Sequence, residues 1–206
     1  MSSRNWEILG VDHVAIAVMQ ETFDSWKGVW TKIFGGRVFY DIADANPGGS
    51  SSMRLCGIKA GNLSIALIAG IDREEKSQVT KYVERHGDHS IQHIAVAIKN
   101  IAAFLDESRE RGVGFLGELL QRQDPWGGEI KQIFGYPFDE RLPSDEAPFF
   151  EFVERPQVGS TFSSGDSFSS DFARDLYHDV EEAAREEHHG VFIPRRILDS
   201  LKTSAK

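Results

Sequence analysis

Two stretches of the chain, eighty residues apart, repeat one alternation of bulky and small apolar residues: residues 10–18 and residues 90–98. In each stretch a single histidine, His13 or His93, opens a run in which valine or isoleucine alternates with alanine. A period of two is typical of a β-strand whose two faces differ. The repeat predicts a duplicated chain in which each copy begins with such a strand.

On each of these strands the histidine and the alanines share one face, and the bulky residues share the other. The bulky face is expected to pack against a helix, whereas the small residues leave open volume in front of the histidine. A cavity lined by His13 and His93 is therefore the first structural hypothesis.

The first copy continues with one helix and three strands. Apolar residues at helical spacing predict a helix over residues 21–34 that ends at Gly35 and Gly36. Three further strands are predicted at residues 37–40, 52–56 and 63–68. The first module therefore has the order βαβββ.

The second copy repeats that order. Asn100 is placed to cap a helix over residues 101–111. Its three strands are predicted at residues 113–120, 131–134 and 149–153. Between the copies, an apolar stripe within the charged residues 72–89 predicts a short connecting helix. The expected fold class is α+β, with paired βαβββ modules that form an open, cupped mixed β-sheet and a helix at the C-terminus.

We expect one domain over residues 1–156, with a first module at about residues 9–70 and a second at about residues 90–156. Residues 157–171 are rich in serine and glycine, a composition typical of a flexible linker. In the remaining segment, residues 172–206, apolar residues four apart predict a helix that begins at Phe172 and ends near Gly190, and the pattern leaves residues 191–206 unassigned. Two interpretations of this helix stay open: it packs on the outside of the sheet, or it forms a lid over the cavity.

Glu151 places a carboxylate in the middle of an otherwise apolar strand. A buried carboxylate without a partner costs several kcal/mol, so it needs a cation or a proton. Two strand histidines and one strand glutamate fit a facial site of two histidines and one carboxylate. Alignment of the last strands of the two modules places Ala66 at the position of Glu151. An open site with three protein ligands suits Fe(II) and O₂.

Composition narrows the classes of function. The formal net charge of the 206 residues is −9 at pH 7, which would repel a phosphate backbone, so neither nucleic acid nor a membrane is an expected partner. No apolar run approaches the ~20 residues that cross a bilayer, and the first residues lack the apolar centre of a signal peptide. The single cysteine, Cys56, is typical of a reducing compartment. A cytoplasmic location is expected.

Several separated motifs resemble one family. Paired βαβββ modules with ligands on their first strands are similar to the vicinal oxygen chelate superfamily. Within it, residues 11–182 resemble the C-terminal, catalytic domain of 4-hydroxyphenylpyruvate dioxygenase. That family usually carries a second, N-terminal domain of the same fold, so the chain resembles half of the enzyme. The motifs are Ser77-Gln78, Gln92-His93-Ile94-Ala95, Lys131-Gln132-Ile133-Phe134, Phe149-Phe150-Glu151-Phe152-Val153-Glu154-Arg155 and Ser164-Gly165-Asp166-Ser167-Phe168.

The resemblance implies roles for individual residues. It implies that His13, His93 and Glu151 bind Fe(II), with O₂ as co-substrate and with Gln132 also in the catalytic set. The residues that it places around the substrate are Ser52, Gln78, Gln92, Gln132, Phe134, Phe149 and Phe168. The family has an asparagine in a Pro-x-Asn stretch where this chain has residues 69–71, Ala-Gly-Ile, so a related 2-oxo acid stays open as the substrate.

The expected function is that of a non-haem Fe(II)-dependent dioxygenase or hydroxylase that decarboxylates a 2-oxo acid oxidatively, with an aryl-pyruvate-like substrate. Two alternatives stay open. A divalent-metal epimerase, isomerase or lyase of the same fold would work through an enolate and would usually have a fourth ligand at the position of Ala66. A non-catalytic small-molecule-binding protein would leave Glu151 without an explanation. A homodimer is expected by analogy with the fold.

Overall fold

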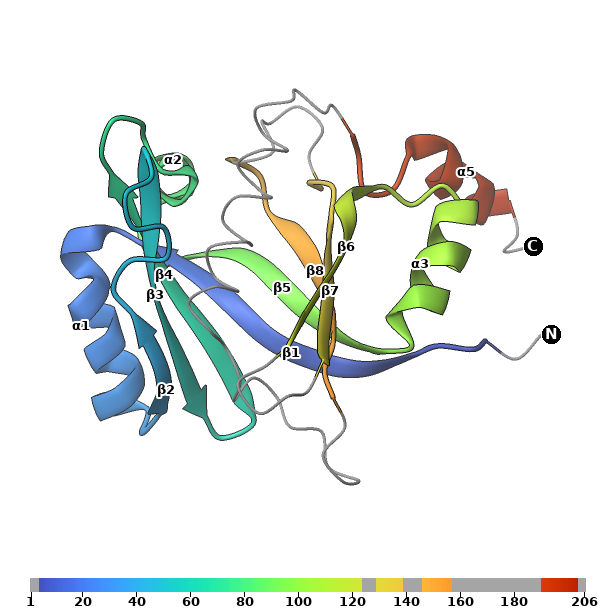
Figure 1. Cartoon of the computed structure of the whole chain (residues 1–206). Helices are drawn as coiled ribbons and strands as arrows, with labels where there is room; N and C mark the ends of the chain where they lie inside the picture. Colours follow the sequence, from blue (N-terminus) through green and yellow to red (C-terminus); the bar gives the residue numbers. More distant parts are fainter. Residues whose placement is uncertain (1–3, 124–128, 139–145, 157–189, 204–206) are drawn as a thin grey trace.

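The computed structural model describes residues 4–123, 129–138, 146–156 and 190–203. Its eight strands form one mixed sheet in the order β2-β3-β4-β1-β5-β8-β7-β6. The two histidine strands, β1 (Glu7–Val18) and β5 (Ser90–Lys99), pair antiparallel at its centre. The sheet curls, so that one module lies on each side of these two long strands (Figure 1). The predicted cupped mixed sheet is confirmed.

Each module has the predicted βαβββ order. After β1 the first module contains a 3-10 turn (Gln20–Thr22), α1 (Phe23–Gly28), a π-helical turn (Val29–Ile33), β2 (Arg37–Ile42), β3 (Ser51–Ala60) and β4 (Leu63–Asp72). After β5 the second contains α3 (Ile101–Glu110), β6 (Phe115–Gln123), β7 (Glu129–Gly135) and β8 (Phe149–Glu154). The connecting helix is α2 (Gln78–His86), and α5 (Arg195–Thr203) follows the modules.

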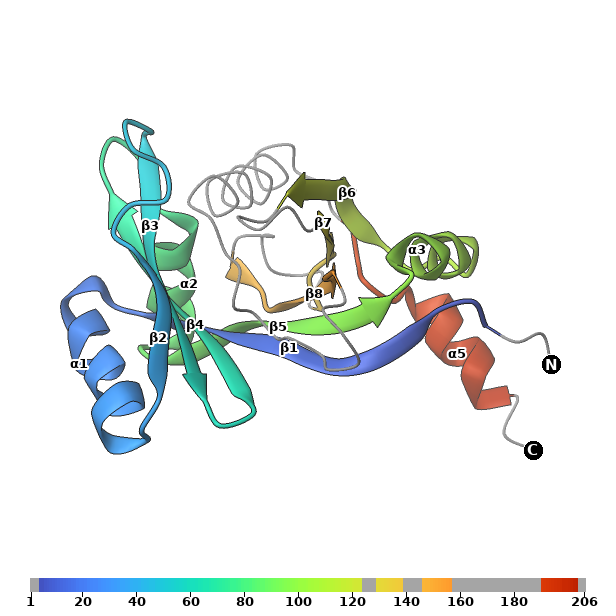
Figure 2. The same ribbon diagram turned by 60° about the horizontal axis from the view of Figure 1, so that its bottom comes forward.

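The bulky faces of the two histidine strands pack against helices, as predicted. Ile16 and Val18 of β1 pack against Phe23 of α1 in one core cluster. Ile98 of β5 packs against Phe104 of α3 in another. The opposite face of β1 packs against α2, and Figure 2 shows α1 and α2 on opposite sides of the first module's strands. The alternation in the sequence therefore decides which face of the sheet is left for a site.

The start of α3 is fixed by two caps. The Asn100 side chain accepts a hydrogen bond from the backbone of Ala103, as the sequence predicts for a capping residue. The Glu154 carboxylate at the end of β8 accepts from the backbone nitrogens of Asn100 and Ile101, at 2.8 and 3.1 Å. A carboxylate at a helix N-terminus is favourable because free N–H groups point toward it. These contacts attach α3 to the strand that carries Glu151.

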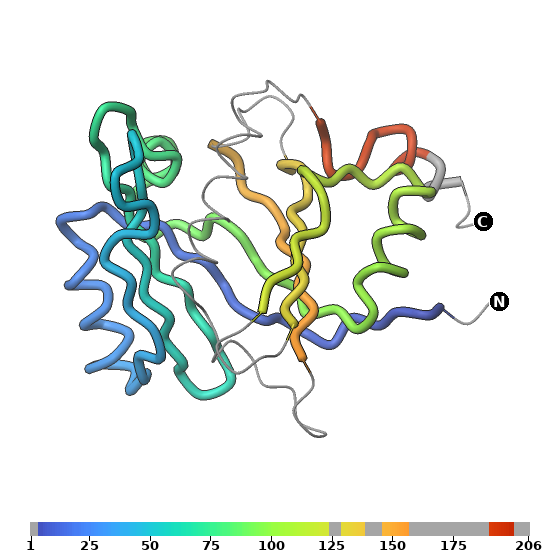
Figure 3. Tube along the Cα trace, viewed as in Figure 1, coloured from blue at the N-terminus to red at the C-terminus, as the bar shows by residue number. Residues whose placement is uncertain are grey.

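Two features of the packing differ from the prediction. Ile33 and Phe34, expected on the apolar face of the first helix, are 72% and 59% exposed, and the helix ends at this point in a π-helical turn. The final residues, which the sequence pattern leaves unassigned, contain α5 and place Phe192 against Phe150 and Phe152. Figure 3 shows α5 at the same end of the molecule as α3 and the start of β1.

The predicted linker at residues 157–171, most of the predicted C-terminal helix and Phe168 lie outside the described residues. Among the helices that are described, none is long and apolar enough to span a membrane. The homodimer, the cytoplasmic location and the lid stay predictions.

Truncation of the core of the second module should cost much more stability than truncation at the surface. Phe152 is 5% exposed and contacts the rings of Phe104, Phe115 and Phe192. We expect Phe152→Ala to lower the free energy of unfolding by about 3–5 kcal/mol, measured by urea denaturation. Ile33→Ala, on the exposed end of the first helix, should change it by no more than about 0.5 kcal/mol. Equal losses in the two variants would contradict this description of the core.

Candidate metal centre

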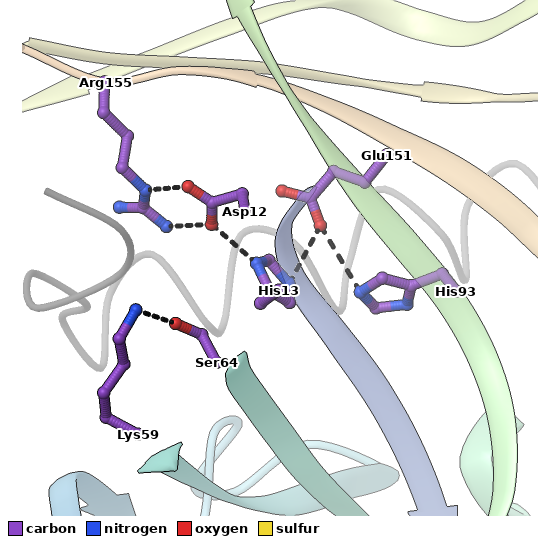
Figure 4. Close-up of polar contacts among 7 residues, drawn as sticks. All are labelled: Asp12, His13, Lys59, Ser64, His93, Glu151 and Arg155. Atoms are coloured by element: carbon purple, nitrogen blue, oxygen red, sulfur yellow. Dashed lines mark hydrogen bonds and ion pairs between the residues drawn. The ribbon is translucent and has the colours of Figure 1, made fainter. Parts of the chain in front are cut away.

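Three side chains predicted as ligands converge at the centre of the sheet. His13 of β1, His93 of β5 and Glu151 of β8 offer ligand atoms that lie within 4.8 Å of one another. The Nε2 atoms of His13 and His93 lie 3.5 and 3.4 Å from the same carboxylate oxygen, Oε2 of Glu151 (Figure 4). Glu151 is 2% exposed and His93 is 6% exposed.

The atoms at this point of convergence fit a divalent metal. His93 Nε2 and Glu151 Oε2 are buried, and neither makes a hydrogen bond with any residue in the described part of the chain. Buried polar atoms in folded proteins nearly always have partners. Two imidazole nitrogens and one carboxylate oxygen are ligands that iron and similar divalent metals accept. A cation among the three side chains would give both atoms a partner.

Each histidine is oriented by the residue directly before it. His13 Nδ1 lies 2.8 Å from Oδ1 of Asp12, and His93 Nδ1 lies 3.2 Å from Oε1 of Gln92. Both partners are acceptors, so each Nδ1 carries the proton and donates it. The lone pair of each imidazole is then on Nε2, which faces Glu151. Such a tautomer is the one required for metal binding through Nε2.

The charges around the site shift the pKa values of its residues in opposite directions. Burial would raise the pKa of Asp12, but the Arg155 guanidinium and the hydrogen bonds to Asp12 outweigh burial and hold that pKa well below its usual range. Burial lowers the pKa of His93. Burial also acts on His13, but the carboxylates of Glu151 and Asp12 outweigh it and raise the pKa of His13. Protons therefore compete with a metal mainly at His13.

The register of the sheet explains why the site has one carboxylate. β1 and β4 pair parallel with Ala15 opposite Ala66, and β5 and β8 pair parallel with Ala95 opposite Glu151. Ala15 and Ala95 each stand two residues after a site histidine, so Ala66 and Glu151 occupy equivalent places in the two modules. The alignment made from the sequence is therefore confirmed by the strand pairing. A methyl group takes the place of a second carboxylate, and the site stays open on that side.

A pocket opens in front of His13 and His93, with an empty volume of about 480 Å³ that includes space open to solvent. Apolar side chains make most of its wall. Its lining residues are His13, Tyr40, Met53, Leu55, Ala66, Ile68, Gln78, Val79, Gln92, His93 and Phe149. None of these is a lysine, arginine, aspartate or glutamate, so the lining within the described residues has no permanent charge.

The sequence also matches a known family model, that of the glyoxalase/bleomycin resistance protein/dioxygenase superfamily, over residues 12–127. The chain belongs to this superfamily. Its curated relatives include the 3-dehydroshikimate dehydratases of Pseudomonas aeruginosa and Pseudomonas putida, 25% and 23% identical over 171 residues. Each alignment covers 70% of this chain and 26% of the relative. The superfamily domain described here thus spans about a quarter of the length of those relatives.

Solved structures give the same fold. A variant of 4-hydroxymandelate synthase from Streptomyces coelicolor superposes with a TM-score of 0.66 at 20% identity, over 84% of this chain and 53% of that one. A xylose isomerase-like TIM barrel/4-hydroxyphenylpyruvate dioxygenase fusion protein superposes with a TM-score of 0.58 at 17% identity, over 88% of this chain and 30% of that one. At these identities the likeness shows the vicinal oxygen chelate fold.

In this superfamily domain, three of the residues predicted to surround a substrate line the pocket: Gln78, Gln92 and Phe149. Phe149 stacks on the His93 ring at 4.9 Å between centroids and meets Phe134 edge to face at 5.9 Å. The predicted aromatic residues Phe134 and Phe149 are thus in contact beside the site. The structure describes no atom of Phe168.

Gln132, which the resemblance places in the catalytic set and around the substrate, is buried on β7. On β7 it stands two residues from Phe134, which pairs with Glu151, so all three side chains belong to the same face of the sheet. Gln132 is 1% exposed, and neither side-chain atom of its amide has a hydrogen-bond partner among the described residues. It does not line the pocket as described here.

The structure does not bring Ser52 to the pocket. Its hydroxyl donates to Oδ1 of Asp44 at 2.6 Å and accepts from the backbone of Asn46 at 2.8 Å. Met53 and Leu55 line the pocket, so alternation along β3 places Ser52 on the opposite face and Ser51 on the pocket face. The resemblance implies Ser52 rather than Ser51, because local sequence does not reveal which face of β3 is turned inward.

Three residues at the site carry no role in the sequence-based prediction: Asp12, Tyr40 and Arg155. Asp12 is a buried carboxylate in an apolar strand, the same signal that identifies Glu151. Arg155 belongs to a motif shared with the family, but its partner lies 143 positions earlier and cannot be found from local sequence. Tyr40 reaches the pocket from β2, and burial raises the pKa of its hydroxyl well above the usual range.

Removal of the negative charge of Glu151 should abolish metal binding without unfolding the protein. We expect Glu151→Gln to stay folded, because the amide has the same shape, and to bind no Co(II) in equilibrium dialysis. Co(II) should raise the thermal midpoint of the wild-type protein and leave that of this variant unchanged. Glu118→Gln is the control, since the Glu118 side chain is 88% exposed. Retention of Co(II) binding by Glu151→Gln would contradict the assignment of this carboxylate as a ligand.

Proposed function

We propose that the protein is a non-haem Fe(II)-dependent dioxygenase that decarboxylates a 2-oxo acid oxidatively. The observation that carries the proposal is the convergence of three ligand atoms, one each from His13, His93 and Glu151. In the first module an alanine, Ala66, occupies the place that corresponds to Glu151, so it supplies no fourth ligand. Three protein ligands leave about three positions of an octahedral metal for a bidentate 2-oxo acid and O₂. Fe(II), when bound, would supply the redox chemistry toward O₂ and the chelation of the keto and carboxylate oxygens.

The overall reaction balances between one 2-oxo acid and one O₂. The carbon–carbon bond between the keto carbon and its carboxylate breaks and releases CO₂. One oxygen atom enters the new carboxylate, and the other forms a hydroxyl group on the remaining side group. The four electrons that reduce O₂ come from the substrate, two from decarboxylation and two from the hydroxylated carbon. The protein therefore needs no separate reductant, and its own task is to orient the substrate and exclude water.

The pocket supports a substrate with one negative charge and an apolar side group. Among the described residues of the site, Asp12 and Arg155 neutralise each other, so a divalent metal beside Glu151 would give these residues and the metal one net positive charge. A monoanionic 2-oxo acid would cancel that charge, whereas a dicarboxylate such as 2-oxoglutarate would add a second, unpaired negative charge. Besides the histidines, the neutral polar side chains among the described lining residues are Tyr40, Gln78 and Gln92. An aryl-pyruvate-like side group could stack beside Phe149.

The names of two structural relatives agree with this class of reaction. One is called 4-hydroxymandelate synthase, and the other contains a part called 4-hydroxyphenylpyruvate dioxygenase. The curated relatives are called dehydratases, and this name favours a second candidate, the lyase of the same fold. The alanine at residue 66 supports the dioxygenase, because a lyase of this fold would be expected to have a fourth ligand there. A non-catalytic binding role would leave Glu151 and His93 facing each other without a function.

An anaerobic titration with Fe(II) and a panel of 2-oxo acids tests the proposal. We expect monoanionic aryl and alkyl 2-oxo acids to give a weak visible charge-transfer band that decays when O₂ is admitted, with equimolar uptake of O₂ and release of CO₂. The dicarboxylate 2-oxoglutarate should bind more weakly than any of them. Zn(II)-loaded protein is the control and should show neither band nor O₂ uptake.

Two results would contradict the dioxygenase. One is Fe(II) binding without a band or O₂ uptake for any 2-oxo acid. The other is turnover of 3-dehydroshikimate without O₂ in the presence of Co(II) or Zn(II), which would move the lyase to first place.

A further inference from the structure

We propose that Asp12 and Arg155 form a positioning pair that fixes His13 for metal binding and thereby sets the metal affinity of the site. The inference rests on the proposed metal centre and assigns a role to two residues that bind no metal themselves. It is carried by the contacts of these residues, which Figure 4 shows beside the three candidate ligands.

The pair is buried and held by two hydrogen bonds. Arg155 donates from Nε to Oδ2 of Asp12 at 2.7 Å and from Nη2 to Oδ1 at 3.0 Å. The side chain of Asp12 is fully buried and that of Arg155 is 8% exposed. Oδ1 of Asp12 also accepts from Nδ1 of His13. The planar guanidinium thus fixes the carboxylate in one plane, and the carboxylate fixes the imidazole.

The contacts of the pair connect the strand that carries His13 with the strand that carries Glu151. Arg155 directly follows β8, the strand that carries Glu151, and Asp12 directly precedes His13 on β1. β1 and β8 are not neighbours, because β5 lies between them in the sheet. The pair therefore joins two strands that share no backbone hydrogen bonds. The separation of His13 Nε2 from Glu151 Oε2 is consequently fixed by the sheet and also by the pair.

A local irregularity of β1 allows Asp12 and His13 to act together. Neighbouring side chains of a regular strand point to opposite faces, so Asp12 would normally point away from the site. The pairing of β1 with β5 shifts register between Val11 and His13, and Asp12 is the residue at the shift. β-bulges of this kind redirect a side chain and often occur next to active sites. Here the shift brings the carboxylate to Nδ1 of its own neighbour.

The two candidate histidine ligands differ in the partner of Nδ1. His93 donates to the neutral amide of Gln92, at 3.2 Å, whereas His13 donates to a carboxylate at 2.8 Å. A carboxylate on the far nitrogen makes the imidazole a stronger electron donor to a metal. Arg155 acts through Asp12, because its two hydrogen bonds hold the carboxylate in the orientation in which Oδ1 accepts from His13. His13 is therefore a stronger electron donor to a metal than His93.

The double variant Asp12→Asn/Arg155→Met tests the inference. Both charges are removed, so neither is left buried alone, and the asparagine still offers an oxygen to His13. We expect it to fold and to bind Co(II) about 10- to 100-fold more weakly than the wild type, measured by competition with a chromophoric chelator. The matched control is Asp24→Asn/Arg54→Met, which removes an ion pair elsewhere in the first module, bonded at 2.8 Å. Its Co(II) affinity should equal that of the wild type.

The single variant Arg155→Lys serves as a second test that does not depend on the folding of the double variant. Lysine keeps the positive charge but cannot donate through a planar fork. The Co(II) affinity of this variant should fall by a smaller factor, about 3- to 10-fold. Urea denaturation of each metal-free variant separates a loss of stability from a loss of affinity, since a purely structural ion pair would change only the former.

Different results would overturn different claims. If the wild type binds Co(II) and the double variant binds it with equal affinity, the positioning role is wrong and the metal centre stands. If the double variant does not fold, wild-type affinity in Arg155→Lys has the same meaning. If the wild type itself binds no Co(II), the proposed metal centre fails and the positioning role fails with it.

Discussion

The carboxylate of Glu151 is buried between two imidazole rings, and the rest of the structure can be understood from the need to compensate that charge. A carboxylate in an apolar interior is unfavourable unless a cation or hydrogen-bond donors lie beside it. In the described part of the chain, the Nε2 atoms of His13 and His93 lie 3.5 and 3.4 Å from Oε2 of Glu151. Because their Nδ1 atoms donate to Asp12 and Gln92, each imidazole in its neutral form has its lone pair on Nε2. A metal ion would satisfy all three groups together.

The duplicated chain supplies the symmetric part of this arrangement. Two copies of one strand place two histidines in equivalent positions, and both histidines line the pocket. The function proposed here depends on where the copies differ. Glu151 of one module corresponds to Ala66 of the other, and Gln92 corresponds to Asp12. These two differences leave the site open on one side and make its histidines unequal.

Much of the architecture could be predicted from the sequence because its signals are local. The alternation in the histidine strands, the asparagine cap at residue 100 and the apolar stripe of α2 each lie within a few residues, and the structure contains all three elements. The ligand set could be proposed because a charged residue in an apolar strand is conspicuous. The equivalence of Ala66 and Glu151 followed from the repeat and agrees with the register.

The remaining features depend on distant or geometric information. The packing of Phe192 on β8 joins segments that no local pattern connects. The inward face of β3 depends on the curl of the sheet, so local sequence does not reveal that Ser52, whose hydroxyl bonds to Asp44, lies on the opposite face. The pair of Asp12 and Arg155 depends on a register shift between β1 and β5, and the alternation of residues does not predict that shift. Long-range pairing of this kind becomes visible only when the strands are placed side by side.

The most direct test of the central claim is a crystal structure of the protein loaded anaerobically with Fe(II), with anomalous scattering recorded at the iron edge. We expect one anomalous peak within bonding distance of His13 Nε2, His93 Nε2 and Glu151 Oε2, with water at the remaining positions and no further protein ligand. A peak at another group of side chains, a fourth protein ligand, or no peak at saturating Fe(II) would contradict the three-ligand metal centre.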